Sequence, residues 1–395
     1  MHIRKAVPKL KLIMYETGEF ASVTGGTKRF RELWNYISEN ESAVMFAVTD
    51  GIATEHGEIV KLKKDRLEKY RFFRYVLTRI AFRNKELIQA LNSAEYDCLF
   101  VFDVPSAIGI SLLNVKHICL MCRKDTLLYR KLLLESKGDN RFRINCWMAY
   151  LHVCELICLL KAETIIVQCR FDRDQLLGRH PFFRKSISKK LIVQINNVNP
   201  EWIVKNSNAP IEVTIPSLQD GINICCVCNF KDKRKGADII LEAFVSVYES
   251  SNNISLYMIG GGEELAEYKK MYEKYPNIHF LGNQSNPISY LKQCDYAVVP
   301  SRADSCPNTV MEAVYNEIPV IGSNAGGIPD ILVDKDALFE PDVLSLAEKL
   351  RQMENKEFRE RLKERQRERK KELMFNWPEK ILSECRRGAA STDEK

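Results

Sequence analysis

Asp304 and Glu312 stand on either side of a segment whose residue types favour the start of a helix. Residues 296–300 form a short apolar run, typical of a buried parallel strand, and a polar loop follows them. In that loop we expect Ser305 to cap a helix with Pro307 in its first turn. Unpaired N–H groups at a helix start attract anions, and carboxylates accept hydrogen bonds from hydroxyls. Two acids around an anion site predict a pocket for a nucleotide sugar.

This stretch resembles the family 4 retaining glycosyltransferases of the GT-B fold. Their signature is an acid, seven residues, Glu, Ala and then a strand beginning with Pro-Val, which is matched by Asp304, Glu312, Ala313, Pro319 and Val320. The resemblance implies that Asp304 binds hydroxyls of the donor sugar and that Glu312 binds the nucleotide ribose. It also implies contacts to sugar and phosphate from the main chain of Cys306, Pro307, Asn308, Thr309 and Val310. An isolated acid pair is more often a loop acid and a solvated helix residue, but family-like segments continue through the C-terminal half.

A second such segment follows the apolar run at residues 222–228. The family has Gly-Arg and then Lys-Gly here, and both cations contact the donor diphosphate. Residues 235–236 match the second half, so the resemblance assigns Lys235 to the diphosphate. Asn229 occupies the arginine position, and either its neutral side chain or a nearby cation, Arg234 or Lys231, takes that role. For the nearby cations a solvated turn remains the simpler interpretation.

Glycine turns lie at two further places in the C-terminal half. Three consecutive glycines follow the strand expected at residues 254–259. The resemblance places the donor nucleotide beside these turns, with the predicted contacts Gly260, Gly262, Leu281 and Gly282. Another Gly-Gly turn is at residues 326–327. Glu317 stands where the family usually ends a helix with glycine, so we expect Asn316 to adopt the left-handed conformation there.

The N-terminal half carries weaker signals. Gly25 and Gly26 follow a predicted strand and precede a predicted helix, and the resemblance implies a loop that covers the donor phosphates. A Gly-Gly pair alone is more often only a turn. Many family members have a histidine after the strand expected at residues 117–121. Arg123 and Asp125 occur in this region, so they are our candidates on the acceptor side.

Strand-like and helix-like segments alternate along all 395 residues. This alternation predicts an α/β protein with parallel sheets covered on both faces, and the length suits two domains. The resemblance implies the GT-B fold, in which two Rossmann-like doubly wound domains face each other across a cleft. We place an acceptor-side domain at residues 1–205 and a nucleotide-sugar-binding domain at 206–375. Residues 376–395 would form a helix that crosses back to the first domain, and a tail.

Charge is divided unequally between these halves. Residues 1–205 hold 34 Lys+Arg against 22 Asp+Glu, net +12, whereas residues 206–395 hold 25 against 30, net −5. Apolar residues at helical spacing occur among the cations between Lys61 and Lys85, a pattern that fits an anionic membrane surface. An apolar stripe packed on the sheet, with solvated cations, explains the same pattern. No nucleic-acid recognition motif accompanies the basic residues, so we expect no nucleic acid partner.

The thirteen cysteines do not predict a metal site. Most lie in or beside apolar strands, and the Cys-x-x-Cys pair at 119 and 122 has no second pair, so we expect buried reduced thiols. The sequence opens without a basic-then-apolar leader, and charged residues interrupt its longest apolar region, 149–169. We therefore expect a cytoplasmic protein, or one peripheral on the cytosolic face of a membrane.

The prediction is a retaining glycosyltransferase that moves a hexosyl group from a nucleoside diphosphate sugar, with UDP or GDP, to an acceptor hydroxyl. It would need no metal and no cofactor, because Lys235 and the helix start at Pro307 can stabilise charge on the diphosphate. The resemblance implies a saccharide or lipid-linked acceptor and products such as lipopolysaccharide, capsule or glycolipids. Two alternatives stay open. One is a catalytically degenerate binding subunit, favoured by Asn229 in place of Arg, by Asp304 in place of Glu and by the absence of a histidine after the strand at residues 117–121. The other is a GT-B-fold nucleotide-sugar epimerase.

Overall fold

The computed structural model describes most of the chain, which folds into two compact units. The described residues are 11–16, 25–47, 57–62, 84–93, 95–136, 138–198, 200, 203, 214–215, 221–230, 233–248 and 253–390. Unit 1 comprises Met1–Gln168, Arg173–Gln194 and Asn376–Lys395, and unit 2 comprises Cys169–Asp172 and Ile195–Phe375. The main division thus follows Gln194, whereas the sequence analysis places it after residue 205. Lys231, most of the stretch between Lys61 and Lys85, and most of residues 206–220 lie outside the described part.

The sheet of unit 1 contains seven described strands, and all its pairings are parallel. Its spatial order is β3 (Glu58–Lys61), β2 (Ser42–Ala47), β1 (Lys11–Glu16), β4 (Cys98–Phe102), β5 (Ile118–Cys122), β6 (Thr164–Val167) and β7 (Leu191–Val193). The central strands are continuous apolar runs, as expected of parallel strands covered on both faces; every residue of β4 and β5 is buried.

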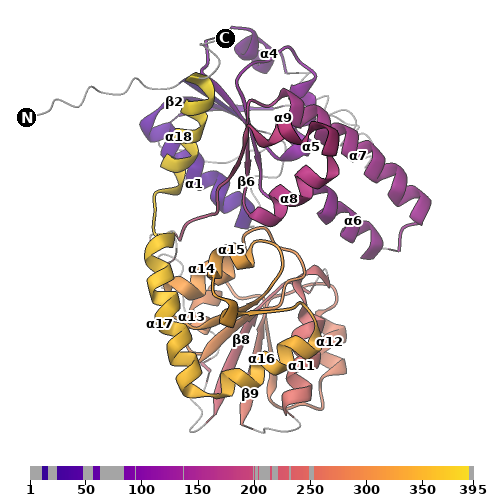
Figure 1. Ribbon diagram of the computed structural model, residues 1–395, viewed down its shortest axis with the longest axis vertical. Helices are drawn as coiled ribbons and strands as arrows, with labels where there is room; N and C mark the ends of the chain where they lie inside the picture. The colour runs from indigo at the N-terminus through magenta and orange to yellow at the C-terminus, as the bar shows by residue number, and fades with distance from the viewer. Residues whose placement is uncertain are drawn as a thin grey trace, which may run out of the picture. The chain divides into compact units, whose positions relative to one another are not determined.

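Helices flank this sheet (Figure 1). They are α1 (Gly25–Asn40), α4 (Lys85–Asn92), α5 (Asp103–Ser111), α6 (Thr126–Ser136), α7 (Arg141–Lys161), α8 (Arg170–Arg179), the 3-10 turn η2 (Pro181–Phe183), α9 (Arg184–Ser188) and α18 (Trp377–Ala390). The last of these belongs to unit 1 although the chain before it belongs to unit 2, which confirms the predicted crossover helix. The fully buried Trp377 is at its start.

The sheet of unit 2 contains six described strands, again all parallel. Its order is β10 (Ile278–Gly282), β9 (Ile254–Ile259), β8 (Ile222–Val227), β11 (Tyr296–Val299), β12 (Val320–Ser323) and β13 (Leu338–Phe339). Its helical elements are η3 (Lys233–Lys235), α11 (Ala237–Tyr248), α12 (Leu265–Met271), α13 (Pro287–Leu291), α14 (Asn308–Tyr315), α15 (Ile328–Leu332), η4 (Lys335–Ala337), α16 (Val343–Glu354) and α17 (Lys356–Leu373).

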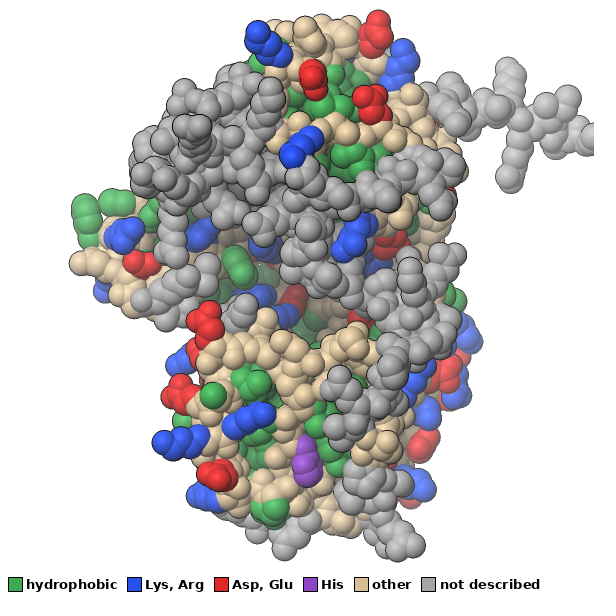
Figure 2. All heavy atoms as spheres, turned by 180° about the vertical axis from the view of Figure 1, so that it is seen from behind, with side chains coloured by type: hydrophobic (Ala, Val, Ile, Leu, Met, Phe, Trp, Pro, Cys, Tyr) green, Lys and Arg blue, Asp and Glu red, His purple; other side chains and the backbone are tan. Residues whose placement is uncertain are grey.

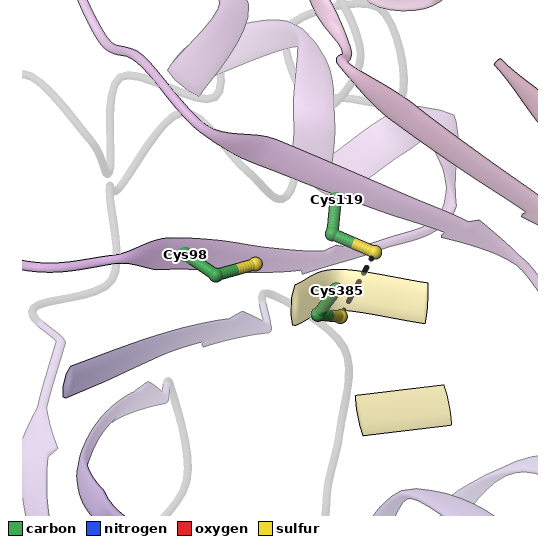
Figure 3. A group of neighbouring side chains, drawn as sticks. All are labelled: Cys98, Cys119 and Cys385. Atoms are coloured by element: carbon green, nitrogen blue, oxygen red, sulfur yellow. Dashed lines mark hydrogen bonds between the residues drawn. The ribbon is translucent and has the colours of Figure 1, made fainter. Parts of the chain in front are cut away.

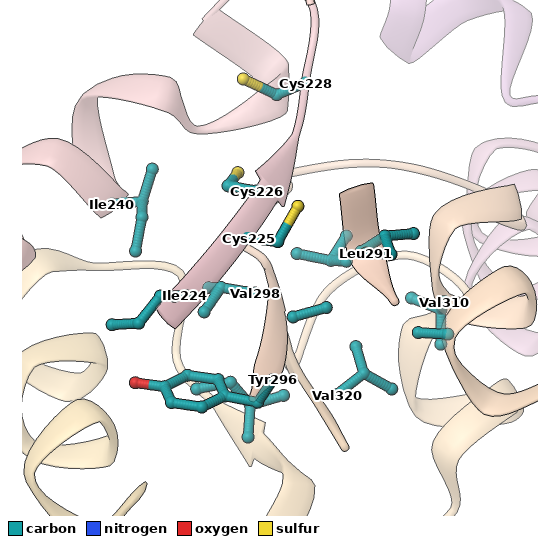
Figure 4. Packing of buried hydrophobic residues seen from close by; sticks show 14 of the residues in the cluster. Ile224, Cys225, Cys226, Cys228, Ile240, Leu291, Tyr296, Val298, Val310 and Val320 are labelled. Atoms are coloured by element: carbon teal, nitrogen blue, oxygen red, sulfur yellow. The ribbon is translucent and has the colours of Figure 1, made fainter. Parts of the chain in front are cut away.

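The core of unit 2 lies on both faces of its sheet. Figure 4 shows side chains of β8 and β11 between Ile240, on one side, and Leu291 and Val310, on the other. Each of these three residues has at most 1% of its surface exposed. Helices on both faces of parallel sheets in two units make the predicted fold class correct.

Charged side chains of both signs are interspersed on one face of the molecule. On the face drawn in Figure 2, Lys and Arg lie among Asp and Glu, and the described residues there form no continuous basic stripe of the kind that nucleic acids require.

Candidate functional site

The strand order of unit 2 changes direction between β8 and β11. From β8 the chain continues to β9 and β10 on one side, and from β11 it continues to β12 and β13 on the other. In open parallel sheets the loops at such a switch point diverge and leave a crevice at the carboxyl ends of the strands, where ligands bind. Lys235 follows β8 and Asp304 follows β11, so the topology brings these two predicted site residues to one place.

Lys235 and Asp304 form an ion pair, the Nζ atom of the lysine donating to the Asp304 Oδ2 atom. Their side chains are 27% and 17% exposed, so both are partly sheltered from water. Burial raises the pKa of the Asp304 carboxyl, but Lys235, Arg234 and the Cys306 N–H together lower that pKa by more. Asp304 is therefore a carboxylate at neutral pH, and its countercharge is the residue predicted to bind a diphosphate.

Two further arginine contacts hold the loop after β8 against the loop after β11. The Arg234 guanidinium donates to the Ala303 carbonyl at 2.7 Å, and the Arg302 N–H donates to the Arg234 carbonyl at 2.7 Å. The Arg302 guanidinium also forms a bidentate pair with Asp238 on α11, at 2.7 and 2.8 Å. Arg234, a predicted donor contact, thus helps to position the loop after β11.

Glycine permits this close approach of the loops. Gly236 has φ +71°, and a Cβ atom there would lie 2.0 Å from the Pro300 carbonyl oxygen. Gly326, with φ +59°, packs on the backbone of Asp304 itself: a Cβ atom would lie 2.2 Å from the Asp304 carbonyl oxygen, which also accepts a hydrogen bond from the Gly327 N–H at 2.8 Å. The Gly-Gly turn therefore fixes the backbone that carries the candidate acid.

Helix α14 begins beside the ion pair, at Asn308, with its cap two residues later than predicted. Pro307 is its N-cap residue and no side chain caps it, so the expectation that Ser305 is the cap was wrong. Pro307 and Cys306 are buried, and Asn308 and Thr309 are half-buried. The N–H of Val310 donates to the Pro307 carbonyl at 3.2 Å, and its side chain is in the core.

Glu312 lies in the second turn of α14 and is 6% exposed. A solvated helix residue, the simplest alternative, is therefore excluded. A buried carboxylate needs partners to offset its loss of hydration, which is consistent with a position inside a polar site.

The end of α14 differs from the prediction. Glu317, not Asn316, has the left-handed conformation, with φ +58°. Its carboxylate accepts from Arg367 and Lys370 of α17, each at 3.0 Å. Tertiary ion pairs at this position explain why a residue with a side chain is found where local geometry favours glycine.

The remaining predicted donor contacts lie at the carboxyl edge of the same sheet. Gly260 and Gly262 follow β9, Leu281 and Gly282 end β10, and the exposed Asn229 follows β8. Hydrogen bonds from Gly260 N–H to the Gly282 carbonyl, 2.8 Å, and from Phe230 N–H to the Gly261 carbonyl, 3.0 Å, connect these turns. Gly25 and Gly26 belong to unit 1, where they begin α1.

In unit 1 the acceptor-side candidates have structural partners. Arg123 donates to Asp103 through its N–H, 2.8 Å, and its guanidinium, 2.9 Å. Asp125 accepts from the Leu128 N–H at 2.8 Å and pairs with Arg179. Sequence reasoning missed Asp103, which directly follows β4 with φ +57°. Asp103 stands beside the switch point between β1 and β4, and only its positive φ, invisible in the sequence, distinguishes it.

Three buried thiols from distant parts of the chain meet in unit 1 (Figure 3). The Sγ atoms of Cys98, Cys119 and Cys385 all lie within 4.8 Å of one another, the spacing at which a soft metal ion could be held. Hydrogen bonds from the other two thiols lower the pKa of Cys98 to about 5 despite its burial. Because Cys385 is on α18, the cluster also anchors the crossover helix to the sheet.

The chain is similar in sequence and in structure to known glycosyltransferases. Residues 216–369 match the family described as "Glycosyl transferases group 1". The O-antigen biosynthesis glycosyltransferase WbnH of Escherichia coli is 26% identical over 156 residues, which are 40% of this chain and 44% of that protein. The matched region thus spans less than half the length of such curated relatives.

Solved structures are similar along nearly the whole chain. Sucrose-phosphate synthase from Thermosynechococcus elongatus has a TM-score of 0.70 at 16% identity, covering 98% of this chain and 100% of that chain. HepE of Anabaena, solved in complex with UDP-glucose, has a TM-score of 0.65 at 12% identity, with coverages of 98% and 100%. These likenesses show the GT-B fold. Residues 216–369 thus match the group 1 glycosyltransferase family, and the chain has the GT-B fold.

Proposed function

We propose that this protein is a retaining glycosyltransferase that transfers a hexosyl group from a nucleoside diphosphate sugar to an acceptor hydroxyl. The observation that carries the proposal is the ion pair of Lys235 and Asp304 at the β8/β11 switch point of unit 2. A family match over residues 216–369 supports it, since this range contains Lys235, Asp304 and Glu312.

The ion pair suggests how the donor would bind. A diphosphate carries more negative charge than one carboxylate, so it competes with Asp304 for the Lys235 ammonium. Once Lys235 turns to the phosphates, the Asp304 carboxylate is released to accept hydrogen bonds from sugar hydroxyls. Its lowered pKa keeps it ionised, and therefore a strong acceptor, throughout the neutral range. Lys235 and Asp304 would thus pair with each other without the donor, and bind its phosphates and its sugar once the donor is present.

Charge stabilisation in this site would not require a metal. As the glycosidic bond breaks, negative charge grows on the leaving diphosphate. Lys235 and the start of α14 supply fixed positive charge where it develops, and Arg234 adds to it from the adjacent loop. Glu312, buried in the second turn of α14, would hold the ribose hydroxyls. Retention of configuration is part of the proposal and rests on the family resemblance.

The substrate class follows from the relatives. WbnH is named for O-antigen biosynthesis, and a Staphylococcus aureus relative, CapM, for capsular polysaccharide biosynthesis. We propose a saccharide or lipid-linked acceptor in surface polysaccharide or glycolipid synthesis, with the protein in the cytoplasm or peripheral on the cytosolic face of a membrane.

The test measures turnover without knowing the acceptor, because retaining transferases also pass the sugar slowly to water. Release of UDP or GDP from UDP-glucose, UDP-galactose and GDP-mannose would be followed in EDTA, and the anomer of the first-formed sugar read by NMR. We expect one donor to be cleaved with retention by the wild type, and not by Glu312→Ala. Inversion would overturn the mechanism.

A degenerate binding subunit is one of the two alternatives, favoured by the exposed Asn229 at the position where the family pattern has an arginine. It predicts nucleotide binding without cleavage of any donor, even with acceptor-rich membrane extracts added. Cleavage that depends on Glu312 excludes it.

A further inference from the structure

Helix α7 of unit 1 carries an apolar stripe on its exposed side. Its buried residues, Ile144, Leu151, Cys154, Glu155, Cys158 and Leu159, face the domain. Opposite to them, at alternating spacings of four and three residues, is a second apolar row: Phe142, Cys146, Ala149, Val153, Leu156 and Leu160. Of these, Leu156 is half-buried and packs against the core. Phe142, Val153 and Leu160 are 77%, 55% and 41% exposed. At 100° per residue these six positions lie within a single strip along the helix.

Two exposed phenylalanines follow a residue that contacts α7. The ring of His152, on α7, lies 4.4 Å from the ring of His180, which directly precedes η2. In η2, Phe182 is 96% exposed and Phe183 is 40% exposed. Lys190, after α9, donates to the carbonyls of Leu160 and Ala162 at the end of α7, at 2.9 and 2.5 Å. The α7 stripe and residues 181–190 therefore belong to one part of unit 1, as the labels α7 and α9 in Figure 1 indicate.

Cations outnumber acids around this surface, where the acid nearest to the start of α7, Asp139, pairs with Arg143 at 3.4 Å. Arg141, Arg143 and Lys161 stand at the two ends of α7, and Arg184, Lys185, Lys189 and Lys190 follow η2. Residues 181–190 contain no acid. The acid of α7, Glu155, is 2% exposed and is bound by Arg179 and His180, each at 2.9 Å. Apolar side chains flanked by cations, without exposed carboxylates on these two segments, match the anionic headgroups and acyl chains of a membrane interface.

Helix α7 is also long and apolar enough, by length and composition, to cross a membrane, although core helices of soluble proteins pass the same criterion. Its contacts argue for a different orientation. Glu155 is held in a buried ion pair, and the helix packs along α5 and α6. Spanning a bilayer would break those contacts and place a carboxylate in hydrocarbon. Lying in the plane of the interface keeps them.

We propose that the outer face of α7, with Phe182 and Phe183, docks unit 1 on an anionic membrane surface. This surface differs from the segment between Lys61 and Lys85 to which the sequence pointed. The inference rests on the proposed function only in that a membrane would bring the enzyme to a lipid-linked acceptor.

The test is co-sedimentation of the full chain with vesicles, without donor or acceptor. One set of vesicles is phosphatidylcholine alone, and the other contains about 30% phosphatidylglycerol, which gives an attractive negative surface potential. We expect binding to the anionic vesicles that weakens with salt. The triple variant Phe142→Ser, Val153→Ser, Phe182→Ser should bind at least about tenfold less, as loss of three inserted side chains implies. Leu344→Ser, which removes an 82%-exposed leucine of unit 2, should bind normally.

Absence of binding to anionic vesicles overturns the proposal. The proposal is also overturned if the triple variant still binds while a second triple variant, Lys69→Gln, Arg71→Gln, Arg74→Gln, does not. Docking would then use the segment between Lys61 and Lys85. A concentration-dependent dimer that the triple variant abolishes, without vesicle binding, would make the face a contact between copies. UDP and GDP binding by the triple variant, measured in parallel, verifies folding and keeps a failure here separate from a failure of the proposed function.

Discussion

The ion pair between Lys235 and Asp304 is the feature at the residue scale on which the functional account depends. In the absence of ligand each residue neutralises the other, so both charges tolerate partial burial. A donor would exchange this internal pair for two new contacts, one with phosphate and one with sugar. The two residues should therefore respond differently to mutation.

Lys235→Ala should weaken UDP or GDP binding about 10- to 100-fold, because it removes a charge-assisted contact worth about 1.5–3 kcal/mol. Asp304→Asn should leave the affinity for the free nucleotide equal or higher, since Lys235 no longer has an internal competitor, while lowering turnover of the sugar donor by a similar factor. Isothermal titration and donor cleavage measure the two effects. Parallel loss of nucleotide affinity in both variants would contradict the exchange.

The pH dependence of the pair follows from the lowered pKa of Asp304. A depressed folded-state pKa contributes stability that is fully present above the unfolded value, about 3.9, and is lost as the pH falls through the folded value. The difference in unfolding free energy between wild type and Asp304→Asn should thus be constant from about pH 5 to 8 and shrink below about pH 4. Urea denaturation at each pH measures it. A difference that grows on acidification would refute the assignment.

At the scale of elements, two turns depend on contacts with distant segments. The Gly326-Gly327 turn packs on the backbone of Asp304, and the left-handed Glu317 ends α14. Each turn couples a local conformation to a distant segment, the first to the loop after β11 and the second to α17.

Gly326→Ala should displace Asp304, because its Cβ atom would lie 2.2 Å from the Asp304 carbonyl oxygen and its φ is positive. We expect a loss of about 1–3 kcal/mol in stability and weaker binding of the sugar donor. Gly178→Ala is the matched control: nothing lies within 4 Å of its Cβ position on α8, so stability should be equal or slightly higher. Unchanged donor affinity in Gly326→Ala would show that the turn does not position the acid.

Glu317→Gly and Glu317→Ala separate conformation from charge. Both lose the ion pairs to Arg367 and Lys370, but only glycine relieves the left-handed backbone. The glycine variant should therefore be more stable than the alanine variant by about 1 kcal/mol in urea denaturation. Equal stabilities would mean that this backbone carries no strain.

The elements were more predictable than their contacts. Strand β9 was predicted with the observed bounds, because fully buried parallel strands are continuous apolar runs. Strand β3 was not recognised, since its four residues, half-buried or exposed, form only a short edge strand. Ser305 was a reasonable cap by residue type, but the chain begins the helix after Pro307. The pair of Lys235 and Asp304 joins residues 69 apart, and only the adjacency of β8 and β11 reveals it.

At the scale of the whole molecule, the candidate donor site and the exposed apolar face of α7 lie in different units. Unit 2 contains the candidate donor site, whereas the N-terminal part of the chain carries the basic excess and the exposed apolar face of α7. The crossover helix α18 returns the end of the chain to unit 1, where Cys385 joins Cys98 and Cys119. Donor recognition in one unit and acceptor approach through the other would follow from this division.

The most direct test of the account is thermal stabilisation of the full chain by UDP, GDP and ADP and their common sugars, in EDTA. A ligand that binds only the folded state must raise the melting temperature by mass action. We predict that UDP or GDP stabilises the wild type, that Lys235→Ala abolishes the shift, and that Lys233→Ala, two residues earlier in η3, retains it. No shift with any nucleotide at millimolar concentration, or an equal shift in Lys235→Ala, would contradict the central claim.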